Sequence, residues 1–100
     1  MIARIWRGVV LSADADYYSQ YIKDTGFSRY GETEGNRGAW LLRRDAGERT
    51  EFLTFSLWES IDAVKAFAGE DYETAVYYPE DERYLVERDD RCAHYDVDPG

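Results

Sequence analysis

Residues 50–63 read TEFLTFSLWESIDA, and this stretch decides the fold. The alternation and the aromatic and β-branched content of its first nine residues predict a strand over 50–58. One side of that strand carries Phe52, Thr54, Ser56 and Trp58, and the other carries Glu51, Leu53, Phe55 and Leu57. Because both sides present large apolar side chains, this strand belongs to a sheet that is covered on both faces.

The residues on either side of this strand complete a hairpin and a helix. Upstream, 38–44 forms another predicted strand, joined to the first through the turn-rich loop 45–49. Downstream, Ser60 is a capping residue, and the helix that it begins ends at Gly69. One stripe of that helix is apolar and consists of Ile61, Val64, Phe67 and Ala68.

The beginning of the chain adds a strand and a helix. Alternation over 2–11 predicts the strand, and Gly8 within it marks a bulge or a close approach. A helix follows the capping residues near Asp14, and Gly26 ends it because glycine takes the left-handed conformation readily. Residues 27–36 are rich in turn formers and predict a loop.

The end of the chain adds the last strand. Residues 70–78 predict a short helical turn that Pro79 breaks, and 80–86 predict one more turn. Residues 91–97 predict a final strand. The order is therefore β-α-β-β-α-β, which predicts an α+β, ferredoxin-like fold: one antiparallel sheet with both helices on one face. Residues 1–97 form a single domain in this prediction, and 98–100 form a short tail.

The apolar content of the strands also predicts an oligomer. Two helices cover only one face of the predicted sheet, whereas the first three strands carry apolar side chains on both faces. The second face therefore needs another cover. A second copy of the chain is the economical one, so we predict a homodimer.

Charge and composition exclude several classes of function. Among 100 residues, 21 are acidic and 12 are basic, the net charge is −9, and eleven of the acids lie in 70–100. Such a body repels phosphate backbones and anionic lipid, so we expect neither nucleic acid nor a membrane as a partner. Without an apolar span or a secretory signal, the expected location is cytoplasmic. The single Cys92 excludes an internal disulfide and a cysteine zinc site.

Three features together resemble the antibiotic biosynthesis monooxygenase superfamily. They are the β-α-β-β-α-β order, the Gly38-Ala39-Trp40 opening of the second strand, and the run Leu57-Trp58-Glu59-Ser60-Ile61-Asp62-Ala63 from strand into helix. The resemblance covers roughly residues 1–97. It implies a dimeric α/β barrel, which agrees with the homodimer that the strand pattern predicts.

Two catalytic branches of this superfamily make different demands on the sequence. The haem-degrading branch resembles this chain at Trp58, but it needs an axial histidine on the second helix and an asparagine in the first strand. Residues 60–78 contain no His, and residues 1–11 contain no Asn. The remaining oxygen ligands for a haem iron in this region are three tyrosines, Tyr72, Tyr77 and Tyr78. The cofactor-free branch, which also resembles this chain at Trp58, implies oxidation of phenolic or anthrone rings to quinones without any cofactor.

Trp58 and His94 are the candidate catalytic residues. The resemblance places Trp58 beside the cavity of the fold, and the alternative is a core tryptophan. His94 is the only histidine, and its ordinary pKa suits a general base. The alternative is a half-buried strand residue.

Tyr72, Tyr77 and Arg83 are the candidate substrate-binding residues. They lie around Pro79, where the resemblance implies that the cavity opens. Arg83 suits a phenolate or carboxylate, or it pairs with neighbouring acids. The tyrosines also suit the rim of a core or a dimer interface. No metal-ligand spacing is present, so no metal is expected.

Two functions remain open at this point. The first is a cofactor-independent, monooxygenase-like enzyme that acts on a small phenol- or anthrone-type aromatic substrate. The alternative is a non-catalytic dimeric domain that binds a small hydrophobic ligand. Oxidation of such compounds in air, followed by quinone absorbance, separates them.

Overall fold

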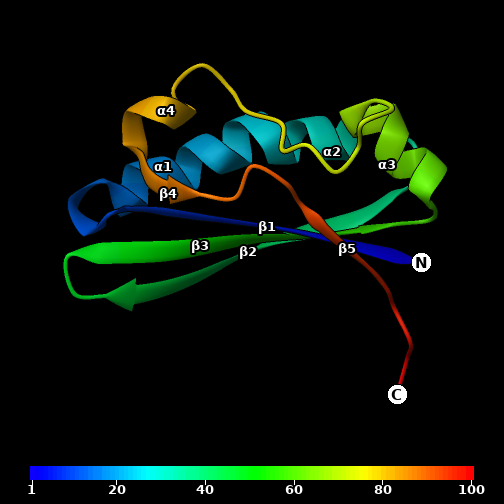
Figure 1. Ribbon diagram of the computed structural model, residues 1–100, viewed down its shortest axis with the longest axis horizontal. Helices are drawn as coiled ribbons and strands as arrows, with labels where there is room; N and C mark the ends of the chain where they lie inside the picture. Colours follow the sequence, from blue (N-terminus) through cyan, green and yellow to red (C-terminus); the bar gives the residue numbers. More distant parts are fainter.

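The computed structural model describes all of residues 1–100, as one antiparallel five-stranded sheet with its helices on a single face (Figure 1). The strands are β1 (Ile2–Leu11), β2 (Asn36–Ala46), β3 (Arg49–Trp58), β4 (Leu85–Arg88) and β5 (Ala93–Asp96). The helices are α1 (Ala15–Ile22), α2 (Ser28–Glu32), α3 (Ile61–Ala68) and α4 (Asp81–Tyr84). The predicted α+β class, with an antiparallel sheet and helices on one face, is confirmed.

β1 lies at the centre of the sheet. β3 pairs with it along its whole length, from Ile2 opposite Trp58 to Leu11 opposite Arg49, and β2 pairs with the other edge of β3. On the free edge of β1, β5 pairs with residues 2–5 and β4 with residues 8–10. The final strand predicted over 91–97 therefore corresponds to β5, and β4 is an additional strand that the sequence did not predict.

The gap between β4 and β5 follows from where the intervening chain makes its hydrogen bonds. The Ala75 N–H donates to the Asp90 carbonyl (2.9 Å), and the Cys92 N–H donates to the Glu73 carbonyl (2.6 Å). The indole Nε1 of Trp6 also donates to the Asp89 carbonyl (2.9 Å). Residues 90–92 thus pair with 73–75, whereas the Asp89 N–H still donates to the Arg7 carbonyl of β1 (3.0 Å).

The first helix is longer than predicted. α1 continues through a π-helical turn, Lys23–Phe27, into α2, so Gly26 lies within the helix and has no left-handed backbone. The predicted loop over 27–36 is wrong for residues 28–32. Phe27 and Tyr30 explain the extension, because their rings stack at 5.5 Å and pack against the core around Trp58. Tertiary burial here overrides the local glycine signal.

The region after α3 also differs from the prediction. Residues 70–78 form no helix, and Thr74 makes an isolated bridge with Arg91. The helical turn predicted over 80–86 is confined to α4, and Leu85 already begins β4. Residues 70–80 form an irregular strap that crosses the helices in Figure 1 (yellow). Part of this strap covers the cavity described below.

Local signals around α3 are confirmed. The Ser60 Oγ accepts a hydrogen bond from the Ala63 N–H (3.2 Å), and Gly69 follows the helix with a φ of +89°. Val64 and Phe67 turn inward and join Trp58 and Tyr30 in one core cluster. A second cluster lies between α1 and the other end of the sheet and contains Val10, Ala15, Tyr18, Ile22 and Phe52.

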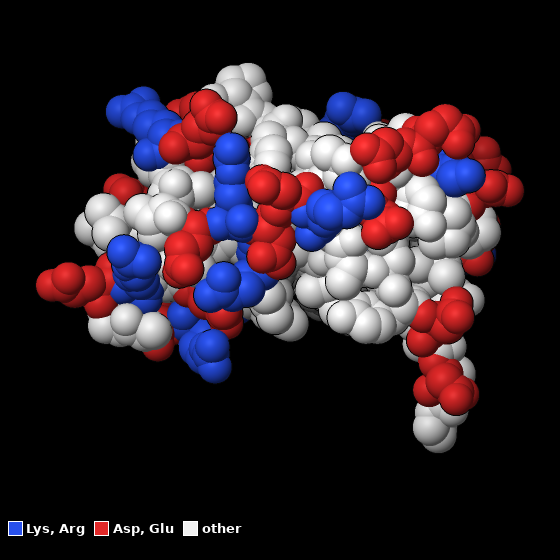
Figure 2. All heavy atoms as spheres, in the orientation of Figure 1, with Lys and Arg blue, Asp and Glu red and all other residues white.

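The face of the sheet opposite the helices is apolar and uncovered within one chain. The register places Trp40 opposite Phe55, Leu42 opposite Leu53, and Tyr95 opposite Ala3 on this outer face. Trp40 is 49% exposed and Tyr95 is 56% exposed. No helix of the structure is long and apolar enough to span a membrane. On the face seen in Figure 2, basic side chains are interspersed with acidic ones and gather into no single basic patch.

Gly8 lies beneath the Trp6 ring, which confirms the predicted close approach. A Cβ at this position would overlap the indole and lie 2.8 Å from the Leu85 side chain. We expect Gly8→Ala to lower the free energy of unfolding by about 1–3 kcal/mol through overpacking, measured by urea denaturation. Gly31→Ala is the matched control, because a Cβ there meets nothing within 4 Å in α2. It should stabilise by roughly 0.5–1 kcal/mol. Equal effects at the two sites would contradict this packing.

Candidate functional site

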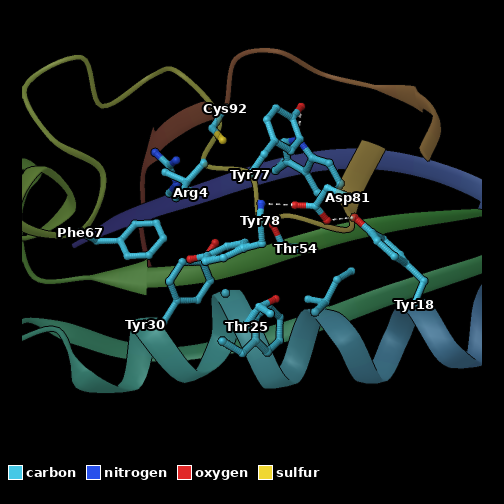
Figure 3. Close-up of a pocket in the computed structure, with 15 residues that line it drawn as sticks. Arg4, Tyr18, Thr25, Tyr30, Thr54, Phe67, Tyr77, Tyr78, Asp81 and Cys92 are labelled. Atoms are coloured by element: carbon cyan, nitrogen blue, oxygen red, sulfur yellow. Dashed lines mark hydrogen bonds between the residues drawn. The ribbon is translucent and has the colours of Figure 1, made fainter. Parts of the chain in front are cut away.

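A cavity of about 50 Å³ lies between the sheet and the helices (Figure 3). Its floor is formed by side chains of β1 and β3, one wall by the continuous helix from α1 to α2, and its cover by the segment around Tyr77 and Tyr78. Ten of its fifteen lining residues are hydrophobic. The polar groups among this aromatic lining are therefore few, and each is described in turn.

Arg4 projects from the helix-facing side of β1 and is 2% exposed. Its Nη1 donates to the carbonyl of Tyr72 and to Nε2 of His94 (3.0 Å). No carboxylate oxygen lies within 4.0 Å of its guanidinium. A buried cation without a counter-ion is costly, so this end of the cavity is strongly favourable to a negative charge.

His94 is a neutral hydrogen-bond acceptor behind Arg4. A guanidinium only donates, so Nε2 of His94 must be the unprotonated nitrogen. Burial, followed by the positive charge of Arg4, lowers the pKa of His94 below its ordinary value. Its Nδ1 is buried without a partner. His94 is not among the lining residues, so it acts on the cavity through Arg4.

Two further tyrosines, Tyr30 and Tyr78, line the cavity. Burial raises the pKa of Tyr30, although the nearby Arg4 and Thr54 act in the opposite direction. Burial also raises the pKa of Tyr78, whose hydroxyl is buried and has no hydrogen-bond partner. Both phenols are therefore protonated at neutral pH and are able to donate a hydrogen bond to an anion.

Asp81 supplies the opposite charge at the other end of the cavity. Figure 3 shows Arg4 and Asp81 at opposite ends, with Tyr78 between them. Asp81 is 5% exposed, and its carboxylate accepts hydrogen bonds from the Tyr18 hydroxyl (2.8 Å) and the Tyr78 N–H (2.6 Å). Each carboxylate oxygen retains a further lone pair. The cavity thus combines a cation, two phenols and a carboxylate within aromatic walls.

The residues predicted from the sequence fall at different depths around this cavity. Trp58 is fully buried in the core, and its Nε1 donates to Ser56 Oγ (2.9 Å). It contacts the lining through the rings of Tyr30 (centroids 5.5 Å apart) and Phe67 (5.8 Å). Its large side chain therefore supports the wall of the cavity rather than forming it.

The predicted substrate-binding residues are also separated. Tyr77 lines the cavity, and its hydroxyl donates to the Asp89 carbonyl (2.6 Å). Tyr72 contributes its carbonyl to Arg4 and packs its ring edge-on against His94 (5.0 Å). Arg83 is exposed outside the cavity, 5.5 Å from the centre of the Tyr84 ring.

Sequence reasoning missed Arg4, Tyr30, Tyr78 and Asp81 as lining residues. The signal for Arg4 was present, because it interrupts the apolar side of the first strand between Ile2 and Trp6. An arginine on a core-facing stripe requires a partner. Asp81 had no comparable signal, since it lies within a run of acids that resembles a solvated surface.

Comparison with known proteins identifies the fold. No protein-family model matches the chain, and no curated protein matches it. A putative antibiotic biosynthesis monooxygenase from Bacillus cereus superposes with a TM-score of 0.68 at 17% identity, over 99% of this chain and 94% of that one. The heme-degrader MhuD from Mycobacterium tuberculosis, solved with two hemes in its active site, gives 0.60 at 20% identity over 100% of both chains. An uncharacterized NIPSNAP domain protein from Burkholderia xenovorans gives 0.61 at 12% identity, over 98% and 95%. The chain therefore has the antibiotic biosynthesis monooxygenase-like fold that the sequence suggested.

Haem does not fit the residues of this chain. The helix expected to carry an axial histidine, α3, carries none. The one histidine has its Nε2 bound to Arg4. Burial raises the pKa of Tyr30 and of Tyr78, which opposes the phenolate that an iron ligand requires.

The lowered pKa of His94 predicts a pH-dependent stability. The unfolded chain takes up this proton first as the pH falls below about 6.5, so His94 destabilises the fold on that side and has no such effect above it. Arg4, Glu73 and the Cys92 backbone face this imidazole. In His94→Gln, which retains an acceptor for Arg4, the loss of stability between pH 7.5 and about 5.5 should be smaller in urea denaturation. An unchanged pH dependence would contradict the neutral assignment.

Proposed function

We propose that the cavity binds one small aromatic molecule and that the protein is a cofactor-independent, monooxygenase-like enzyme acting on a phenol- or anthrone-type ring. The observation that carries this proposal is the pairing of a Tyr78 hydroxyl without a partner and a buried Asp81 carboxylate in the lining of one cavity with aromatic walls. Such a site removes a proton from an acidic ring and stabilises the resulting anion in a medium of low dielectric constant.

The proposed reaction assigns one task to Asp81 and one to Tyr78. Asp81 accepts the proton of the substrate, and the Tyr78 hydroxyl donates a hydrogen bond to the anion that forms. The electron-rich anion reduces dioxygen directly. For an anthrone, one substrate and one O₂ give one anthraquinone and one water, because the reacting carbon gains one oxygen atom and its two hydrogens leave in the water.

In this proposal, two of the residues predicted as catalytic act through others. Trp58 holds the Tyr30 and Phe67 rings in place, since it contacts both. His94 fixes the orientation of Arg4 by accepting its hydrogen bond. Tyr72 supports the same guanidinium through its carbonyl, and Tyr77 forms part of the cover.

A ring requires the cavity to open. About 50 Å³ holds a few water molecules, whereas a benzene-sized cavity measures roughly 150 Å³. The cover suits such a movement, because Val76 and Tyr77 make no backbone–backbone hydrogen bond. Few backbone hydrogen bonds are typical of segments that open locally. We infer that residues 76–79 move aside when the substrate binds.

We also propose that the outer face of the sheet joins two copies into a dimeric barrel. The support is the apolar part of this face, formed by Trp40, Leu42, Leu53, Phe55 and Tyr95 beside the ion-paired Arg7, Glu51 and Arg44, which no helix of the chain covers (Figure 1). An uncovered patch of this kind is typical of an interface. This face lies opposite the cavity, so each copy keeps its own site.

The enzymatic proposal is tested by oxidation in air. Protein that has been treated with a metal chelator is mixed with anthrone or with a phenol that has a free para position. Quinone absorbance is then followed in air and under nitrogen. Asp81→Asn should lower the rate above the protein-free background by roughly 100-fold or more, as for a general base. Glu82→Gln, an exposed neighbour in α4, is the matched control and should retain the rate. A wild-type rate equal to the background would overturn the proposal, provided that melting curves show folded protein.

The alternative, a non-catalytic domain that binds a small hydrophobic ligand, is favoured by one observation. Both Asp81 oxygens already accept a hydrogen bond, from the Tyr18 hydroxyl and the Tyr78 N–H, so the carboxylate already has a structural role in the lining. In that case the same compounds should bind without any oxygen uptake.

A further inference from the structure

We propose that the ligand of the cavity is a small aromatic carboxylate, whose carboxylate group is held by the Nε and Nη2 edge of Arg4. This inference rests on the proposed function, because it takes the cavity as the substrate site. It adds the chemical class of the substrate and the residue that selects it.

Arg4 is buried without an ion-pair partner. Arg4 is the only buried basic residue of the chain, and Asp81 is the only buried acidic one. The two form no ion pair, and they lie at opposite ends of the cavity in Figure 3. Water at the protein surface solvates every other cation, whereas Arg4 has a carbonyl, an imidazole, the Phe67 ring and the nearby Tyr30 hydroxyl as neighbours and no carboxylate. An anion in the cavity would supply the missing counter-charge.

The remaining N–H donors of Arg4 lie on one edge of its guanidinium. Nη1 uses its two N–H groups on the Tyr72 carbonyl and His94 Nε2. Neither Nε nor Nη2 makes a hydrogen bond within 3.5 Å. The free N–H of Nε and one N–H of Nη2 are parallel on one edge of a planar guanidinium. Two parallel donors match the two oxygens of a carboxylate.

The surroundings of Arg4 supply the aromatic part of the specificity. The guanidinium carbon lies 5.8 Å from the centre of the Phe67 ring, and Phe67 in turn packs edge-on against Tyr30 at 4.7 Å. All three residues line the cavity. A ring attached to the carboxylate would thus enter aromatic walls, where edge-to-face and stacked contacts are favourable.

Charge at the far end limits the ligand to a single negative group. The Asp81 carboxylate repels a second anion and accepts a hydrogen bond from a donor such as a phenol. The net charge of −9 also disfavours dianions such as phosphate esters. The expected ligand therefore carries a carboxylate and a hydroxyl on its ring and keeps the position para to the hydroxyl free for oxidation, as a meta-hydroxy aromatic acid does.

Calorimetric titration of the wild-type protein with three probes tests this inference. The probes are 3-hydroxybenzoate, its neutral isostere 3-hydroxybenzamide, and m-cresol, which lacks the polar group. We expect the acid to bind roughly 10- to 100-fold more tightly than the amide, the range for a charge-assisted pair of hydrogen bonds. Equal binding of acid and amide would overturn the inference and leave the proposed function standing. Absence of binding by all three would overturn both.

Substitution of Arg4 tests whether this residue causes the preference for the acid over the amide. Arg4→Met, which keeps the length of the side chain without its charge, should remove the preference for the acid and leave the amide affinity within about twofold. Arg49→Met is the matched control, because Arg49 is exposed at the start of β3, and it should keep the full preference. Arg4→Lys is the second variant if Arg4→Met does not fold, and it should retain part of the preference. If the folded Arg4 variants keep the full wild-type preference for the acid, Arg4 does not hold the carboxylate and the inference is overturned.

Discussion

Trp40→Glu combined with Phe55→Glu is expected to convert the protein from a dimer into a monomer. These two residues face each other across β2 and β3, with ring centroids 5.9 Å apart, on the uncovered outer face. In a face-to-face dimer the substitutions place four carboxylates in an apolar interface, and each buried charge without a partner is costly. Sedimentation at micromolar concentration should give about twice 11.7 kDa for the wild type and about 11.7 kDa for the variant.

The control adds the same charge elsewhere. Ala13→Glu combined with Ser28→Glu changes exposed residues on the helix side of the sheet, so this variant should remain dimeric. A wild-type protein that sediments as a monomer would contradict the proposed barrel. The proposed cavity would survive that result, because its lining comes entirely from one chain.

Trp58→Ala should have the largest effect on stability of any single substitution discussed. Trp58 is 0% exposed, donates a hydrogen bond to buried Ser56, and contacts the rings of Tyr30 and Phe67. Truncation of a fully buried tryptophan removes about 3–5 kcal/mol from the free energy of unfolding. Thermal and urea denaturation measure this loss.

Two further variants show whether the effect of Trp58→Ala comes from burial in the core or from a direct role of Trp58 in the site. Tyr17→Ala removes an aromatic ring of comparable size that is 53% exposed on α1, and its cost should stay within about 1 kcal/mol. Trp58→Phe keeps most of the buried area but leaves the Ser56 hydroxyl without its donor, so about 1–3 kcal/mol should be lost. If Trp58→Phe instead weakens ligand binding with no loss of stability, Trp58 forms the site directly.

The parts of the fold that rest on local signals could be predicted from the sequence. Alternation fixed the hairpin of β2 and β3, and Ser60 with Gly69 fixed the two ends of α3. The helix that runs through Gly26 could not be predicted, because the burial of Phe27 and Tyr30 against Trp58 extends it. The division between β4 and β5 likewise depends on hydrogen bonds to residues 73–75 and to the Trp6 indole, which are distant in sequence.

The candidate site was less accessible to sequence reasoning for a related reason. Arg83 and Arg4 are both single arginines near aromatic residues, and only the path of the strap over 70–80 buries one and leaves the other exposed. His94 was expected as a base on the strength of its ordinary pKa. Its position beside Arg4 lowers that pKa and occupies Nε2, which no pattern within the last strand indicates.

The most direct test of the enzymatic proposal is mass spectrometry of the quinone formed from anthrone under isotopically labelled dioxygen. The metal-chelated protein should form several equivalents of quinone above the protein-free reaction, each with one labelled oxygen atom, and Asp81→Asn should lose this excess. A quinone yield that is the same with wild-type protein, with Asp81→Asn and without protein would contradict a role for this cavity in oxidation.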